Sequence, residues 1–265
     1  MLTAEQHQRI ADELYAAERD RAPVDPLVGR YDGIGAADAY HIQLLNIRRR
    51  VRAGSSVVGH KVGLSSLAMQ RMMGVDEPDY GHLLDDMRAF ETRPVPVRRY
   101  CYPRVEPEVA FLLGADLRAD GCTEADVVAA TEAYAPALEL IDSRIRDWKI
   151  GLADTISDNA SSAGFVLGAA RVKPSDVDIT GIGVTLWRSG ERVAEGRSDA
   201  VLGNPVTAVA WLARKVASFG VRLRAGHVIL PGSCTRAIDA RAGDEFRGDF
   251  DGLGSVSLGF QGGDS

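Results

Sequence analysis

PRVEPEVAFLL, residues 103–113, is the stretch that decides which kind of sheet this chain can build. Its apolar second half predicts a buried β-strand, yet Glu106 and Glu108 stand two residues apart just before that half. Side chains at positions i and i+2 of a strand point to the same face, so the two carboxylates would share one side. Pro107 between them is typical of an edge strand, a strand start or a bulge. Something must therefore compensate two neighbouring charges.

A second apolar segment carries another carboxylate. PALELIDSRI, residues 136–145, predicts a strand with Glu139 inside it. Burying an unpaired carboxylate costs several kcal/mol, so such a group is protonated, paired or neutralised by a cation. Three glutamates that converge would suit a hard divalent ion such as Mg²⁺ or Mn²⁺. Pairing with an arginine close in sequence, namely Arg104, Arg144 or Arg146, is the alternative that the spacing leaves open.

The composition describes an ordinary globular chain. A length of 265 residues suffices for one large domain or for a small domain beside a larger one. Hydrophobic residues make up 45% and charged residues 26%, which is typical of a protein with a packed core. The 31 Lys and Arg against 37 Asp and Glu leave a net charge of -6, which argues against a nucleic-acid or membrane-surface binder.

Cysteine usage and the first residues predict a reducing, cytoplasmic location. The chain has three cysteines and no CxxC pair, so neither a disulfide framework nor a zinc site is expected. The N-terminal MLTAEQHQRIADEL is polar and amphipathic, unlike a signal peptide. No apolar run is long enough to cross a bilayer.

Local patterns predict more strands than helices and no regular βαβ alternation, which favours an α+β fold with a curved, mostly β main domain. Charge and proline density near residues 85–96 predicts a boundary between a small N-terminal α/β region, 1–85, and a β-rich catalytic domain, 86–265. GVDEPDYGHLL, residues 74–84, is expected to be a loop. Expected helices cover about 3–17, 36–52, 65–73, 123–133 and 204–220, and expected strands cover 57–64, 103–113, 136–145, 182–188, 192–196, 227–233 and 255–260.

Two further charged residues are candidates for the site. Lys61 stands between Gly59 and Gly63 on an apolar strand, where a lysine is costly unless it meets a carboxylate or a substrate anion. An edge strand with the lysine in water is the alternative. Asp79 lies in the polar segment before Tyr80, where ordinary turn chemistry is the competing explanation.

Two turns rich in serine and glycine can present hydroxyl and N–H groups to an anion. They read DNASSAG, residues 158–164, and LPGSCT, residues 230–235. Other catalytic motifs are missing from the sequence. No Gly-x-Ser-x-Gly nucleophile motif and no HExxH metal motif occurs. The glycine-rich segment 29–35 lacks the Lys-Ser/Thr of a phosphate-binding loop, which excludes that kind of nucleotide site.

Taken together, these pieces resemble the 2-keto-4-pentenoate hydratase family, within the fumarylacetoacetate hydrolase-like superfamily. The resemblance covers most of the chain, in the same order, and its long central block is the most specific part. It implies a rolled, twisted β-sheet with flanking helices and a homo-oligomer built on pentamers, with a downstream pathway aldolase as a further partner. The segments that carry it are GHKVGLSS, DYGHLL, PRVEPEVAFLLGADL, ALELIDSRIRDWKIGLADTISDNASSAGFVLG, NPVTAVAWLA and GHVILPGS.

The resemblance also implies roles for particular residues. Glu106, Glu108 and Glu139 match the family's Mg²⁺ or Mn²⁺ ligands. Lys61 and Asp79 match residues beside the substrate, where they would handle protons. Ser161 and Ser233 match positions that line the substrate pocket.

The implied activity is a metal-dependent lyase. It would add water to 2-hydroxypenta-2,4-dienoate, or to a close alkyl analogue, and form a 4-hydroxy-2-oxo acid in the meta-cleavage catabolism of aromatic rings. Ser161, Ser162 and Phe165 favour a small, mostly apolar pocket for the far end of the substrate. A charged far end would then be rejected, because a buried unpaired carboxylate costs several kcal/mol.

Three rival functions stay open at this stage. A 2-oxo-3-hexenedioate (4-oxalocrotonate) decarboxylase would share the metal site and the first half of the chemistry. An acylpyruvate hydrolase would need a catalytic histidine, a role that His60 or His82 could fill. A non-catalytic partner of a pathway enzyme would keep only the fold, but the intact set of glutamates and Lys61 argues against it.

Overall fold

The computed structural model describes residues 1–262, the side chains of Met72 and Met73 excepted. Its helices are α1 (Ala4–Asp20), α2 (Ala36–Arg52), α3 (Leu67–Met73), α4 (Glu124–Ala130), α5 (Leu152–Ser157) and α6 (Pro205–Ala217). Its strands are β1 (Val57–Gly63), β2 (Asp79–Leu84), β3 (Val95–Pro96), β4 (Arg104–Leu113), β5 (Thr131–Ile141), β6 (Ser162–Leu167), β7 (Gly183–Arg188), β8 (Glu191–Arg197), β9 (Val228–Leu230), β10 (Ile238–Asp239), β11 (Glu245–Phe250) and β12 (Gly254–Gln261). The predicted α+β class is confirmed.

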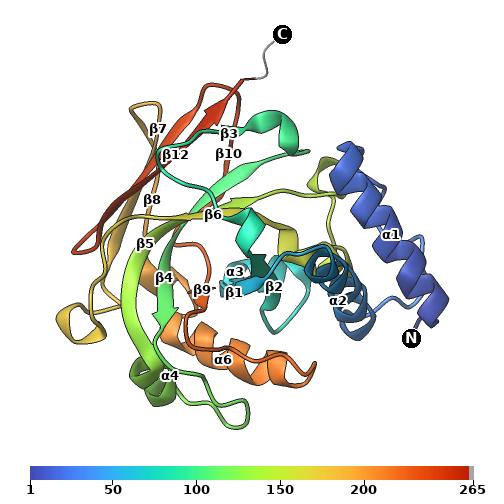
Figure 1. Cartoon of the computed structure of the whole chain (residues 1–265), viewed down its shortest axis with the longest axis horizontal. Coiled ribbons are helices and arrows are strands. Elements are labelled where there is room, and N and C mark those ends of the chain that lie inside the picture. Colours follow the sequence, from blue (N-terminus) through green and yellow to red (C-terminus); the bar gives the residue numbers. More distant parts are fainter. Residues whose placement is uncertain (263–265) are drawn as a thin grey trace.

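The main sheet is mixed and strongly curved. Its strand order is β2-β1-β9-β4-β5-β6. Strand β10 also pairs with β4, outside this order. The β1–β9 pair is parallel, and the β4–β5 pair is antiparallel and the longest in the sheet. Figure 1 shows β4 and β5 bending around the interior, with α1 and α2 on one side and α4 and α6 at one end. The curved sheet thus encloses a space toward which one face of β4 and β5 points.

A second sheet supports the curved one from outside. Its order is β3-β12-β11-β7-β8. Strands β11 and β12 contact β5, and Leu138 and Val166 of the main sheet share one apolar core with Phe246 and Leu258 of the second. That core occupies one face of β5. The opposite face, on which Glu139 lies, is therefore available for the site.

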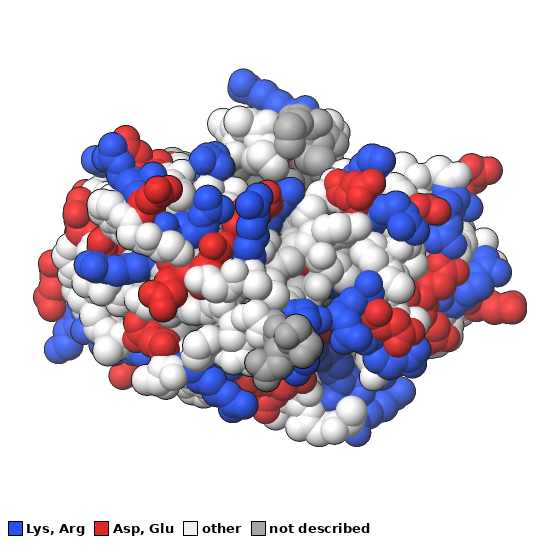
Figure 2. All heavy atoms as spheres, turned by 90° about the horizontal axis from the view of Figure 1, so that it is seen from above, with Lys and Arg blue, Asp and Glu red and all other residues white. Residues whose placement is uncertain are grey.

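The helices follow their capping signals. Thr3 and Gln6 form the predicted capping box of α1, and Asn204 caps α6 with Pro205 at the first helical position. Helix α1 packs on α2, which packs on α5, while α6 lies against β1 and α4. None of the helices within residues 1–262 combines the length and the apolar character that crossing a membrane needs. Figure 2 shows acidic and basic side chains interspersed over one face of the molecule.

Two local expectations were wrong, and one alternative for Pro107 is ruled out. Residues 79–84 form β2 instead of a loop, because their side chains are buried against β1. Helix α4 ends at Ala130, and the chain enters β5 at once. Pro107 causes no bulge, since the register with β5 runs unbroken past it. The carbonyl of Pro107 accepts a hydrogen bond from the N–H of Cys234, on the side of β4 away from β5. The nitrogen of Pro107, which carries no hydrogen, faces that same side, where β4 has no continuous ladder.

The predicted division at residue 85 stays a prediction. Strands β1 and β2, which precede that point, hydrogen-bond to each other, and β1 also pairs with β9 of the later part. The N-terminal region therefore contributes two strands to the same sheet as β4 and β5.

Candidate active site

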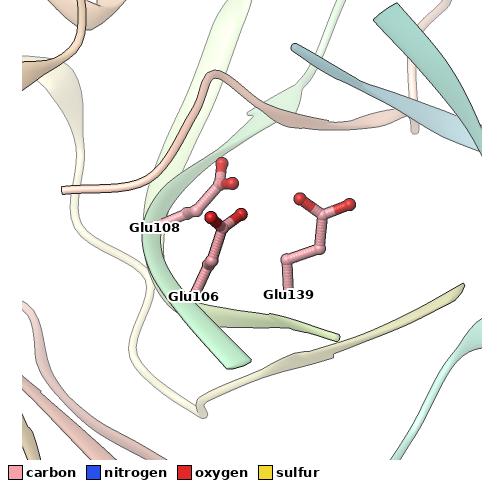
Figure 3. Close-up of side chains that lie close together, drawn as sticks. All are labelled: Glu106, Glu108 and Glu139. Carbon is pink, nitrogen blue, oxygen red and sulfur yellow. The ribbon is translucent and has the colours of Figure 1, made fainter. Parts of the chain in front are cut away.

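The three glutamates of the sequence motif converge on one point. Glu106 on β4 and Glu139 on β5 are direct partners across the antiparallel pair, so both side chains leave the same face. Glu108 follows two residues along β4 and shares that face. Each glutamate offers a carboxylate oxygen within 4.8 Å of the others. Figure 3 shows the three side chains directed toward one region inside the curve of β4. The predicted convergence is confirmed, while the role as metal ligands stays a prediction.

The cluster is buried, and burial disfavours the ionised form of its carboxyl groups. Glu108 and Glu139 are fully buried, and Glu106 is half-buried. Burial raises the pKa of Glu106 to about 7 against the opposing charge of Lys61. Burial likewise raises the pKa of the Glu108 carboxyl, and the charge of Glu139 adds to the effect. Without a cation, the three carboxyls therefore resist joint ionisation.

Arginines do not neutralise this cluster. Arg104, Arg144 and Arg146, the nearest arginines in sequence, each pair with an aspartate instead. The alternative in which each glutamate has its own arginine is therefore wrong within the described residues. A lysine is the cation that the structure places beside the cluster.

Lys61 reaches the cluster from β1. The residue is only 4% exposed, so the alternative of an edge lysine in water is wrong. Its Nζ donates a 3.0 Å hydrogen bond to the carbonyl of Ala160 and lies 3.4 Å from Oε2 of Glu139. Burial alone would lower the pKa of Lys61, but the carboxylates of Glu139 and Glu106 outweigh burial and raise it. Lys61 is therefore an ammonium ion that faces the glutamates.

Asp79 opens β2 on the same face as Lys61. It is fully buried and pairs across the β1–β2 ladder with Gly63. The hydroxyl of Thr155 donates to its Oδ2 at 3.2 Å, while its Oδ1 accepts no hydrogen bond within the described chain. Burial raises the pKa of Asp79, opposed by the charge of Lys61. A side chain at Gly63 would overlap Oδ1 of Asp79, so glycine is what leaves room for the carboxyl.

A strained turn carries the first serine-rich segment into the site. Asn159, Ala160 and Ser161 have φ angles of 55°, 51° and 58°, in the left-handed region that non-glycine residues rarely adopt. The amide of Asn159 anchors the turn to β2, because it bonds both the N–H and the carbonyl of His82, at 2.8 and 2.9 Å. The buried hydroxyl of Ser161 makes no hydrogen bond within the described residues. It is therefore available to a ligand.

The second turn acts mainly on Glu108. The N–H of Gly232 donates a 2.8 Å hydrogen bond to Oε2 of Glu108. Gly232 has a φ of 129°, and a side chain there would overlap Oγ of Ser65, so only glycine fits. Ser233 lines the cavity, but its hydroxyl donates to the carbonyl of Thr235 at 2.8 Å and accepts from the same residue's N–H. Its hydroxyl therefore fixes the turn.

A cavity of about 700 Å³ opens in front of these residues. The predicted residues that line it are Lys61, Asp79, Glu106, Ser161 and Ser233. Glu108 and Glu139 lie beside Glu106 at its inner end. Sequence reasoning missed other lining residues, namely Gly63, Arg104, Trp148, Thr155 and Arg236. The only sequence signal among them was the glycine pair that flanks Lys61.

The expected apolar far end stays a prediction, because the residues that line the cavity are mixed in character. Apolar side chains such as Leu64, Ile141 and Ile150 do line the wall, but Arg104 and Arg236 line it too. Phe165 packs in the core with buried residues of β2 and contributes nothing to the cavity. The sequence argument placed Phe165 by its nearness to Ser161. Phe165 pairs directly with Glu139 across β5 and β6 and so shares its face, but its ring packs against buried residues of β2 and not against the cavity.

His60 and His82 face away from the cavity. They are direct partners across β1 and β2, and strand alternation puts them on the face opposite to Lys61. Their rings lie 4.7 Å apart, and neither ring nitrogen of His60 has a hydrogen-bond partner within the described residues. Burial lowers the pKa of His60, and it lowers that of His82 to about 3. Neither histidine can therefore serve as the catalytic histidine that the hydrolase alternative needs.

Comparison with protein families agrees with this arrangement. The family model described as fumarylacetoacetate (FAA) hydrolase C-terminal matches residues 55–260. This chain belongs to the fumarylacetoacetate hydrolase family. The match takes in β1, β2, β4 and β5, and hence every strand that carries Lys61, Asp79 or a glutamate of the cluster.

Relatives of this fumarylacetoacetate hydrolase family member include several hydratases. A 2-keto-4-pentenoate hydratase of Paraburkholderia xenovorans (strain LB400) is 40% identical over 98% of this chain and 97% of its own length. A 2-oxo-hept-4-ene-1,7-dioate hydratase of Escherichia coli is 42% identical over 96% of this chain and 97% of its own. The resemblance to the hydratase branch is thereby confirmed.

A solved structure matches the fold closely. The 4-oxalocrotonate decarboxylase from Pseudomonas putida G7, complexed with magnesium and adipate, has a TM-score of 0.94 and 36% identity, over 98% of this chain and 99% of its own. Hydratases and a decarboxylase thus share this fold at similar identity.

Proposed function

We propose that this chain is a hydratase that adds water to 2-hydroxypenta-2,4-dienoate or a close analogue, forming a 4-hydroxy-2-oxo acid in meta-cleavage catabolism. The observation that carries the proposal is the convergence of Glu106, Glu108 and Glu139 beside Lys61 and Asp79 at one cavity. Relatives that carry hydratase names along nearly the whole chain support the reaction class.

The glutamate cluster fits a hard divalent cation. Oε1 of Glu108 and Oε1 of Glu139 are buried without a hydrogen-bond partner within the described residues, and Oε2 of Glu139 has only the 3.4 Å ion pair with Nζ of Lys61. Each such orphaned group costs about 1–3 kcal/mol, which a ligated cation would offset. Donors that are all carboxylates suit Mg²⁺ or Mn²⁺. Bound there, such an ion would supply Lewis-acid stabilisation of negative charge on the substrate oxygen next to its carboxylate.

Lys61 and Asp79 are the proposed proton-handling pair. The dienol must be protonated at its far end, and water must then add to the β-carbon of the resulting unsaturated ketone, so the site needs an acid and a base. The Nζ of Lys61 is fixed by Ala160 and Glu139 at the cavity wall. The Oδ1 of Asp79 has no protein partner within the described chain and can hold or accept a proton. The hydroxyl of Ser161, which has no hydrogen-bond partner within the described residues, would position substrate or water.

The decisive experiment is turnover of the simplest substrate. Purified protein with Mg²⁺ should consume enzymatically generated 2-hydroxypenta-2,4-dienoate and yield 4-hydroxy-2-oxopentanoate, and chelation should stop the reaction. Absence of turnover together with absence of any bound dication would favour the non-catalytic alternative. Pyruvate release from an acylpyruvate, without hydration of the dienoate, would favour the hydrolase alternative.

A decarboxylase is the second candidate. The observation that favours it is the decarboxylase structure with a TM-score of 0.94 to this chain. If the hydratase proposal is right, the protein releases little CO₂ from 2-oxohex-3-enedioate. Faster CO₂ release than hydration, at equal substrate concentration, would reverse the assignment.

The proposal extends to assembly and location. We infer a cytoplasmic homo-oligomer built on pentamers, with a downstream aldolase as a partner, and the support for this is the family resemblance. The division into an N-terminal region, 1–85, and a catalytic domain, 86–265, belongs to the same proposal. Light scattering after size exclusion checks the subunit number, and a count that is no multiple of five contradicts the pentamer.

A further inference from the structure

Two arginines line the outer part of the catalytic cavity. Arg104 lies at the start of β4, and Arg236 lies in the loop between β9 and β10. Neither has a part in the chemistry proposed above. Their charge and their surroundings carry an inference about the substrate.

Arg104 is held in a fixed orientation. Its Nε donates to Oδ1 of Asp239 at 2.8 Å, and its guanidinium lies 4.3 Å from the centre of the Trp148 ring. The indole is fixed in turn, because its Nε1 donates to the carbonyl of Tyr102 at 3.1 Å. No protein acceptor within residues 1–262 takes a hydrogen bond from the two terminal nitrogens of Arg104. A planar guanidinium held in this way is prepared to bind a carboxylate through two hydrogen bonds.

Arg236 adds a second positive charge. One of its terminal nitrogens donates to the carbonyl of Val193 at 2.9 Å. No carboxylate of the described chain forms an ion pair with Arg236, whereas nearby arginines such as Arg192 and Arg197 each pair with a carboxylate. Its charge at the cavity is therefore not compensated by the protein.

Arg104 stands just beyond the glutamate cluster on β4, two residues before Glu106. Arg104, Glu106 and Glu108 occupy every second position of β4, so their side chains lie in one row on the same face. Arg104 is the first residue of this row, and the two carboxylates follow it. Two residues of strand separate the Arg104 and Glu106 backbones by about 7 Å. An extended substrate whose first carboxylate is held at the cluster would run outward along this row. Its far end would then meet Arg104.

We propose that Arg104 and Arg236 form a subsite for a second carboxylate, so that the preferred substrates are 2-hydroxy-2,4-dienoates with a carboxylate at the far end. The inference rests on the proposed function and names its substrate class. Among the cations that line the cavity, Lys61 faces Glu139, Arg104 shares its Nε with Asp239, and Arg236 has no carboxylate partner within the described residues. An alkyl end would leave the charge of Arg236 uncompensated and the terminal nitrogens of Arg104 without an acceptor.

A matched pair of substrates tests the subsite. 2-Hydroxyhexa-2,4-dienoate and 2-hydroxyhepta-2,4-dienedioate differ only by a carboxylate on the terminal carbon. The wild-type kcat/KM should be roughly 10-fold higher for the dioate, and Arg104→Met or Arg236→Met should each lower that ratio by about 10-fold, as expected for a hydrogen bond to a charged group. Arg104→Lys should restore part of the ratio. Arg192→Met, an exposed arginine of β8 paired with Glu195, is the control that should leave the ratio unchanged.

A binding measurement separates failure of the subsite from failure of the proposed function. Calorimetry on the Mg²⁺-loaded protein should find adipate tighter than hexanoate, with the preference lost in Arg104→Met. That result supports the subsite even if neither dienoate is turned over, an outcome that contradicts only the proposed function. Turnover of both dienoates at a ratio that neither arginine variant changes would overturn the subsite and leave the proposed function standing. Equal binding of adipate and hexanoate would also overturn it.

Discussion

Glu106 and Glu139 face each other directly across β4 and β5, although they come from different segments of the chain. The pairing register alone brings them together. A shift of one residue would turn one carboxylate to the opposite face, into the core that β5 shares with the second sheet. The unbroken register past Pro107 is therefore what builds the cluster.

Replacing a glutamate of the cluster should weaken metal binding. Glu139→Gln removes a negative charge from a buried set of donors, and we expect the affinity for Mn²⁺ to fall by roughly 100-fold, at the upper end of what loss of a supporting residue costs. Titration with Mn²⁺ followed by electron paramagnetic resonance measures it. Glu132→Gln, an exposed glutamate of the same strand, is the control. Equal affinity of Glu139→Gln and wild type would exclude Glu139 as a ligand.

Loss of the buried lysine should reduce turnover. Lys61→Met keeps the length of the side chain and removes the ammonium beside Glu139, so kcat should fall by about 100-fold or more, the usual size for a proton-transfer group. The circular dichroism spectrum with Mg²⁺ should stay unchanged. Lys149→Met, at an exposed lysine, is the matched control and should turn over normally. A wild-type kcat for Lys61→Met would show that the lysine is structural.

A single methyl group at Gly63 should displace Asp79. In Gly63→Ala the new carbon overlaps Oδ1 of Asp79, so the carboxyl must leave its present position. We expect kcat to drop by at least about 10-fold, because a small misplacement of a catalytic group is costly. Gly35→Ala adds the same methyl in open space at the start of α2 and should be nearly neutral for kcat. Similar kcat values for the two variants would contradict a role for the Asp79 position.

The buried histidines should make the fold sensitive to acid. Burial lowers the pKa of His60, and it lowers that of His82 to about 3, whereas both titrate near 6.5 in an unfolded chain. Below pH 6.5 the unfolded state therefore binds more protons. The free energy of unfolding should fall by up to about 1.4 kcal/mol per pH unit for each histidine as pH drops toward the folded value. Carboxyls such as Asp79, whose pKa burial raises, act in the opposite direction.

Comparing variants isolates the histidine contribution. Urea unfolding at pH 7.5, 6.5 and 5.5 should show a shallower loss of stability in His60→Phe than in wild type, by about 1 kcal/mol per pH unit. His41→Gln, at an exposed histidine, is the control and should follow the wild type. Parallel pH profiles for His60→Phe and wild type would contradict the prediction.

Local signals in the sequence were enough for the residue types and many of the elements. The capping box at Thr3 and the Asn204-Pro205 pair predicted where α1 and α6 begin, because caps act within one turn. The two-residue spacing of Glu106 and Glu108 predicted a shared face. Such patterns work because their physical cause spans only a few residues.

Other elements could not be read locally. GVDEPDYGHLL looks like a loop because its polarity is high, yet residues 79–84 become β2 through pairing with β1 and complete burial. Helix α4 ends before its pattern does, since Thr131 already belongs to the long ladder with β4. In both places tertiary pairing outweighs local propensity.

The sequence by itself determined which groups are costly to bury, namely Glu106, Glu108, Glu139 and Lys61. Only the tertiary structure decided how they are compensated. Strand register joins the glutamates, the turn at Ala160 meets Lys61, and the loop after β9 brings Arg236 to a cavity shared with Arg104. An apolar sequence around a charged residue is a local signal that the charge will be costly to bury. The group that compensates the charge comes from a distant segment of the chain, and no local periodicity encodes that contact.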